Sequence, residues 1–122
     1  MPNLIQRFLR EWRIERRRRR ERATVDLKGD EIVYKRRRKA QHVKWSEITE
    51  IDGGVLAMVS GDLLYVVIVA PNLRWQIDEF TEGFAGLETA IHTRIPGVRE
   101  KWLELNRAHA HNDILVTLWK RE

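Results

Sequence analysis

Carboxylates and histidines are the residues of this 122-residue chain whose types could support catalysis or metal binding. Asp78, Glu79 and Glu82 lie close together, but no nucleophile, phosphate-binding glycine loop or zinc motif accompanies them. Of the four histidines, only His109 and His111 are close in sequence, and residues two apart on a helix do not face each other. Solvated acids at a strand end and polar residues at a helix end explain both groups. We therefore predict no metal, no cofactor and no catalytic site, and that the protein is not an enzyme.

Basic side chains are the other chemically active group, and they gather near the N-terminus. Residues 1–40 carry 15 Lys or Arg against 6 Asp or Glu, a net charge of +9, whereas residues 41–122 carry 8 against 12, a net charge of −4. Our candidate partner-binding residues are Trp12 and two basic clusters, namely Arg16, Arg17, Arg18, Arg19, Arg20 and Lys35, Arg36, Arg37, Arg38, Lys39. Such residues suit an acidic protein surface, an anionic membrane or nucleic acid phosphates.

The first basic cluster follows a predicted amphipathic helix. An apolar stripe at helical spacing ends where the arginines begin, and it consists of Leu4, Ile5, Phe8, Leu9 and Trp12. We expect residues 1–22 to form a basic amphipathic N-terminal helix and residues 23–122 to form a single domain. The helix could lie on an anionic membrane through this stripe. Alternatively, the stripe packs against the sheet and the arginines only keep the protein soluble.

The rest of the chain is organised around the run from Leu63 to Ala70, whose two faces are both apolar and whose ends are bracketed by turn-forming residues. This pattern is typical of a central strand that is covered on both sides. Further strands are predicted over residues 24–27, 32–36, 55–59, 73–78 and 114–119. Short links between consecutive strands favour an antiparallel sheet over parallel units with crossover helices.

Several local details are also predicted. In the first hairpin, the core side is expected to consist of Val25, Leu27, Ile32 and Tyr34. Residues 52–54 (Asp-Gly-Gly) are expected to turn the chain, and residues 46–51 fit a helical turn or a bulged strand equally well.

Two helices are expected near the C-terminal end. Thr81 is expected to N-cap a helix that has Phe84, Leu87, Ala90 and Ile91 on its apolar face. A second helix follows residues 96–97. The predicted structural core includes Trp45, Ile48, Tyr65, Val67, Trp75, Phe84, Leu87, Trp102 and Trp119.

Together, these elements predict an α+β fold: a bent antiparallel sheet or partly closed barrel of pleckstrin-homology-like layout, with an N-terminal amphipathic helix and C-terminal helices. The chain has no cysteine, so neither disulfides nor thiolate metal sites are expected. Charged residues interrupt the apolar N-terminal residues, so we expect no secretory signal and a cytoplasmic location.

Five features spread along the chain carry a resemblance to known proteins. They are residues 43–51 (VKWSEITEI), the central strand after Asp62, the residues around positions 78–87, the sequence Ile-Pro-Gly at 95–97 and the closing residues 118–121. In these features the chain resembles a family of small bacterial proteins with a pleckstrin-homology-like pattern. Several members of such families sit beside toxin genes, which implies an immunity protein that binds and blocks a toxin.

The sequence therefore predicts a non-catalytic binding protein. The first hypothesis, from the resemblance, is an immunity protein that neutralises a cognate bacterial toxin by direct binding. The alternatives are a peripheral membrane or anionic-lipid binding module that uses the N-terminal helix, and a nucleic-acid binder, which the acidic body of the domain disfavours. The identity of the partner, the surface that meets it and the oligomeric state stay open.

Overall fold

The computed structural model describes residues 3–59, 61–108 and 113–122 and has the α+β fold that the sequence predicts. The elements are, in order, α1 (Leu4–Glu21), β1 (Thr24–Lys28), β2 (Glu31–Arg36), β3 (Lys39–Lys44), the 3-10 helix Trp45–Glu47, β4 (Glu50–Ala57), β5 (Asp62–Ala70), β6 (Leu73–Asp78), α2 (Phe84–Arg94), α3 (Val98–Ala108) and β7 (Ile114–Lys120). Residues 46–51 combine the two expected alternatives: the 3-10 helix ends at Glu47, and β4 begins at Glu50 with an irregularity in its pairing with β7 between Ile51 and Asp52.

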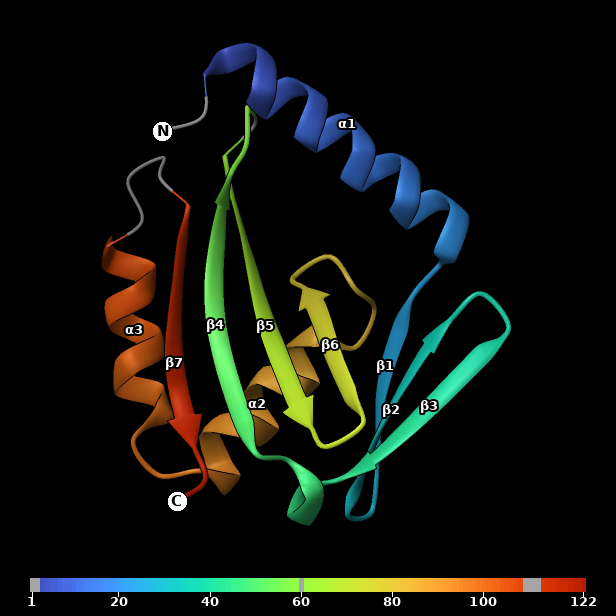
Figure 1. Ribbon diagram of the computed structural model, residues 1–122, viewed down its shortest axis with the longest axis vertical. Helices are drawn as coiled ribbons and strands as arrows, with labels where there is room; N and C mark the ends of the chain where they lie inside the picture. Colours follow the sequence, from blue (N-terminus) through green and yellow to red (C-terminus); the bar gives the residue numbers. More distant parts are fainter. Residues whose placement is uncertain (1–2, 60, 109–112) are drawn as a thin grey trace.

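The strands form two antiparallel sheets and, within the described residues, they do not close into a barrel. One sheet has the order β1-β2-β3, and the other has the order β6-β5-β4-β7. In Figure 1 the three-stranded sheet lies beside the β6 edge of the four-stranded sheet. Helix α2 lies behind the four-stranded sheet, and α3 lies beside β7. The bent sheet of the prediction is thus built from two sheets that share one core.

The prediction of a central strand at β5 is confirmed. β5 pairs with β4 on one side and with β6 on the other. Val66 and Ile68 point into the main core with the C-terminal helices, whereas Tyr65 and Val67 are buried on the opposite face. A strand that is buried on both faces needs apolar residues at successive positions, which is why this run stands out in the sequence.

Most of the predicted core residues are buried in this way. Fully buried are Ile48, Tyr65, Val67, Trp75, Phe84, Leu87 and Trp102. Trp45 and Trp119 are half-buried at the margin of the core. The guanidinium of Arg94 lies 4.9 Å from the ring centre of Trp45, and that of Arg121 lies 5.5 Å from the ring centre of Trp119. Each ring therefore has one face on the core and a cation on its exposed side.

The prediction that residues 52–54 turn the chain is wrong, because β4 runs straight through them. The two glycines serve close packing instead. A side chain on Gly53 would come within 2.9 Å of Leu118 and 3.0 Å of Leu105, and one on Gly54 would overlap the ring of Tyr65. Glycine inside a strand often marks such an approach rather than a turn.

Two smaller predictions are also wrong. The N-cap of α2 is Gly83, not Thr81, because the preceding residues are tied to β1: the carbonyl of Glu82 accepts the N–H of Val25 at 2.8 Å. In the first hairpin Leu27 is 42% exposed, because it lies near the tip of the hairpin, whereas Val25, Ile32 and Tyr34 are buried as predicted.

The tight fit at Gly54 predicts a clear effect on stability. Gly54→Ala places a methyl group against the Tyr65 ring and is expected to lower the free energy of unfolding by about 1–3 kcal/mol. The matched control is Gly86→Ala in α2, where no atom other than those of the adjacent residues and the backbone of the helix itself lies within 4 Å of the added carbon, and where alanine favours the helix. Urea unfolding of both variants checks this, and equal stability of Gly54→Ala and the unchanged protein would contradict it.

Candidate binding surface and cavity

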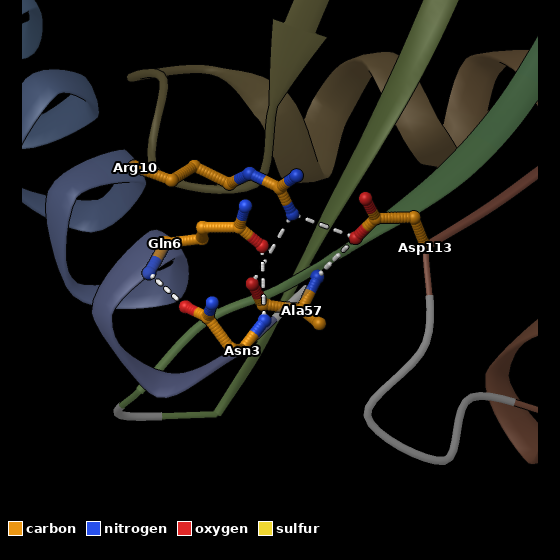
Figure 2. A network of polar contacts seen from close by, with 5 residues as sticks. All are labelled: Asn3, Gln6, Arg10, Ala57 and Asp113. Carbon is orange, nitrogen blue, oxygen red and sulfur yellow. Dashed lines mark hydrogen bonds and ion pairs between the residues drawn. The ribbon is translucent and has the colours of Figure 1, made fainter. Parts of the chain in front are cut away.

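Both ends of α1 are capped by neighbouring residues of the chain. The Asn3 side chain accepts the backbone N–H of Gln6 at 2.8 Å, and the Gln6 side chain accepts the backbone N–H of Asn3 at 3.0 Å, which completes a capping box (Figure 2). At the other end Arg22 adopts a left-handed conformation with φ 46°, and its N–H bonds to the carbonyl of Arg18 at 2.9 Å. The helix therefore has a fixed start and a fixed stop.

The apolar stripe of α1 faces outward. Its exposed fractions are 69% for Leu4, 71% for Ile5, 60% for Phe8, 42% for Leu9 and 52% for Trp12. The alternative in which the stripe packs against the sheet is therefore wrong. The face of α1 that turns toward the rest of the protein is mainly polar, and its half-buried residues are Arg7, Arg10, Glu11, Ile14 and Arg18.

Arg10 attaches this polar face to the ends of two strands. Its Nη1 donates to Oδ1 of Asp113 at 2.7 Å and to the carbonyl of Ala57 at 3.3 Å (Figure 2). The same Asp113 oxygen accepts the backbone N–H of Ala57 at 2.9 Å. Burial alone would raise the pKa of Asp113, but the hydrogen bonds from Arg10 and Ala57 outweigh it and hold the pKa below its usual value. We call these three residues the Arg10 clamp.

The helix divides the first basic cluster between two directions. Arg16, Arg19 and Arg20 are exposed and continue along the line of Trp12, and the guanidinium of Arg16 lies 5.1 Å from the centre of the Trp12 ring. Arg17, which is also exposed, and the half-buried Arg18 line a cavity beneath the helix. The sequence predicted a cluster of five arginines, but it could not predict this division.

The cavity has a volume of about 210 Å³ and lies where α1 meets both sheets. Four of its lining residues are arginines, namely Arg17 and Arg18 from α1, Arg36 from β2 and Arg74 from β6. We call this space the arginine cavity. Its wall also includes the aromatic pair Tyr34 and Trp75, whose ring centres are 5.5 Å apart.

The arginine cavity brings together parts of both predicted basic clusters. Arg36 joins it, while Arg37, Arg38 and Lys39 line, with Arg36, an open groove of about 690 Å³ at the turn between β2 and β3. Arg74 belongs to neither cluster and is not among the partner-binding residues that the sequence predicted. It is the polar partner of Trp75 in an alternating edge strand, and a single arginine in such a strand carries no signal of its own.

The acidic residues that drew attention in the sequence hold loops in place. The Asp78 carboxylate accepts the N–H of Phe80 at 2.9 Å, and the Glu79 carboxylate accepts the N–H of Leu64 at 3.0 Å. Within residues 3–59, 61–108 and 113–122, no group of three or more His, Asp or Glu residues is placed to hold a metal ion. His109 and His111 lie outside the described residues.

Asp52 is a buried acid that the sequence did not single out, because its segment was expected to be a turn. It is 7% exposed in the middle of β4, and its Oδ1 has no hydrogen-bond partner among the described residues. Burial raises the pKa of Asp52 to about 6, and the nearby Glu50 carboxyl acts in the same direction. A charged Asp52 therefore opposes folding at neutral pH.

Comparison with known proteins does not assign this chain to a family. No protein-family profile, curated protein or solved structure matches it. In the part of the chain that the structure describes, no helix is long and apolar enough to cross a membrane.

The raised pKa of Asp52 predicts a pH-dependent gain from its removal. Its pKa is about 6 in the folded protein and 3.8 as the ordinary value, so the penalty for its charge is full above pH 6 and absent below pH 3.8. Asp52→Asn should therefore stabilise the protein by about 1 kcal/mol or more near neutral pH, and this gain should shrink as the pH falls toward 4. Urea unfolding over this pH range measures the difference, and a gain that is the same at every pH would contradict the assignment.

Asp113 is expected to behave in the opposite sense. Because its pKa is lowered in the folded protein, its charge stabilises the fold above its ordinary pKa, and this contribution is lost as the pH falls through the lowered folded value. Asp113→Asn should thus lower stability near neutral pH and cost less in acid. Faster amide hydrogen exchange in α1 of this variant would confirm that the loss comes from the Arg10 clamp, whereas unchanged exchange in α1 would contradict this role.

Proposed function

We propose that this protein is a non-catalytic binding protein that attaches to anionic membrane surfaces through α1. The observation that carries the proposal is the outward direction of the apolar stripe on a helix whose polar face is held by the Arg10 clamp. A contiguous patch of large, exposed apolar side chains marks a surface that binds a partner or a membrane.

The apolar part of the interaction is the burial of the stripe. The side chains of Leu4, Ile5 and Phe8 are each at least 60% exposed, so a partner that covers them removes most of their surface from water. Full burial of one large apolar side chain contributes roughly 1.5–3 kcal/mol. An amphipathic helix that lies in the plane of a bilayer buries its apolar face among the headgroups and upper acyl chains.

The charge of α1 selects an anionic surface. Residues 4–21 contain eight arginines and three glutamates, a net charge of +5. Arg16, Arg19 and Arg20 lie on the exposed side with the stripe. Each cation near an anionic leaflet contributes about 1 kcal/mol. A second copy of the same helix would bring +5 against +5, so the charge disfavours a dimer through this face and favours a negatively charged membrane.

Neutralisation of a cognate toxin stays a prediction that rests on the family resemblance, and nucleic-acid binding stays an alternative that rests on the charge. Both require a partner that recognises a particular surface or a phosphate backbone. The membrane proposal differs from both in that it requires the apolar side chains of α1 to enter a lipid phase.

Vesicle co-sedimentation tests the proposal. The full chain is expected to bind vesicles of mixed phosphatidylcholine and phosphatidylglycerol, and Phe8→Glu with Trp12→Glu should weaken binding by about tenfold or more, because two anchoring side chains are replaced by charges that the membrane repels. Added salt should weaken the binding of the unchanged protein, because it screens the arginines.

The matched control adds the same two charges elsewhere. Leu103 in α3 and Leu115 in β7 are 44% and 54% exposed, and the pair Leu103→Glu with Leu115→Glu should leave vesicle binding intact. If the unchanged protein does not bind anionic vesicles, or if both double variants lose binding equally, the proposal is wrong.

A further inference from the structure

We propose that the arginine cavity is a binding site for a phosphoryl group, carried by a small phosphate ester or by a lipid headgroup. The site lies on the inner face of α1, away from the apolar stripe, so it stands on observations that the membrane proposal does not use.

The first observation is the convergence of charge. Arg17, Arg18, Arg36 and Arg74 come from three elements and meet around about 210 Å³ of space. No ion pair within 4.0 Å joins any of the four to a carboxylate of the described residues. Arg74 lies near enough to Asp52 to act on the pKa of that acid, whose own Oδ1 has no hydrogen-bond partner among the described residues. Four like charges around one small space repel each other, and an anion between them removes this cost.

The second observation concerns how these arginines are held. The Arg18 guanidinium lies 4.3 Å from the ring centre of Phe80, and the Arg36 guanidinium lies 5.4 Å from that of Tyr34. Such stacking fixes the plane of a guanidinium without using its N–H groups. In addition, Nε of Arg18 is buried and has no hydrogen-bond partner in the described part of the chain. The Nε donor of Arg18 is therefore positioned but not satisfied by the described residues.

Among the described residues, the one carboxylate in the wall does not neutralise the site. Asp78 lines the cavity, but its Oδ1 accepts the N–H of Phe80 at 2.9 Å and lies 3.4 Å from the hydroxyl of Thr81. It holds the turn after β6. The wall thus keeps four cationic side chains against one anionic side chain.

The number and kind of donors favour a phosphoryl group over a carboxylate. One guanidinium group can donate two parallel hydrogen bonds to two phosphate oxygens. A phosphoryl group with two negative charges and three terminal oxygens can therefore bind several arginines at once. The cavity is smaller than the roughly 300–1,000 Å³ of typical organic-ligand pockets, which suits such a group and little more. Tyr34 and Trp75 offer an aromatic wall to the adjoining part of the ligand.

Isothermal titration calorimetry with inorganic phosphate tests the site directly. At about pH 8, where phosphate is mainly a dianion, and at constant ionic strength, the full chain should bind one phosphate with saturation. Arg36→Gln with Arg74→Gln should weaken this binding by about tenfold or more, because two charged donors are removed. The charge-matched control, Arg16→Gln with Arg19→Gln on the outer face of α1, should bind phosphate like the unchanged protein.

A conservative pair guards against a loss of folding. Arg36→Lys with Arg74→Lys keeps the charge and removes the fork of donors, so it should fold normally and still bind phosphate more weakly than the unchanged protein. Equal phosphate affinity for this pair and the unchanged protein would overturn the role of the guanidinium groups. Phosphate binding that is absent, does not saturate, or weakens equally in the Arg16/Arg19 control would overturn the site.

Vesicles distinguish the two sources of the phosphoryl group. Phosphatidic acid carries a terminal phosphoryl group, whereas phosphatidylglycerol carries a phosphodiester. If the source is a lipid, vesicles of phosphatidic acid should bind more tightly than vesicles of phosphatidylglycerol at matched charge, and Arg36→Gln with Arg74→Gln should remove this preference. If the source is a soluble phosphate ester, there should be no preference and phosphate should still bind in the calorimeter. Because the calorimetric test needs no membrane, the site and the membrane proposal can fail independently.

Discussion

The contact between Arg10, Asp113 and Ala57 decides which way the N-terminal helix faces. A partly exposed ion pair with two accompanying hydrogen bonds joins α1 to the end of β4 and to the residue before β7, and it keeps the polar side of α1 against the sheets. Once this side is fixed inward, the helical period turns the apolar stripe outward. The exposed surface, the division of the arginines and the roof of the arginine cavity all follow from this one attachment.

The helix differs in this respect from an ordinary amphipathic helix of a globular protein, which buries its apolar face. The partners of Arg10 on its polar side are Ala57 and Asp113, which lie at the ends of two strands. This arrangement leaves the apolar stripe in contact with water, which is unfavourable. Within the described residues, the contact of the Arg16 guanidinium with the Trp12 ring covers part of it. Such an arrangement is understandable when another surface covers the stripe in use.

The sequence predicted the elements better than their relations. Alternation and apolar runs identified β1, β2, β5, β6 and β7. β3 carries little of this signal, because Val43 is its only buried residue. The 52–54 segment was misassigned because glycine serves both turns and close approaches, and only the position of the Tyr65 ring distinguishes the two uses. The direction of α1 could not be predicted, since the spacing of Leu4, Phe8 and Trp12 defines a face but not what the face meets. The cavity was equally hidden, because Arg36 and Arg74 are brought to it by the meeting of two sheets.

The junction between α1 and β1 has a geometric consequence. Arg22, in its left-handed conformation, and Ala23 are all that separate the last residue of the helix from the first residue of the strand. Because this connection is only two residues long, the axis of α1 keeps a fixed angle to the sheets. Figure 1 shows the helix running across one end of the molecule, with the C-terminus at the other end. Any surface that receives the stripe would therefore hold the whole domain in one orientation, with the turn between β5 and β6 and the C-terminal residues at the end away from it.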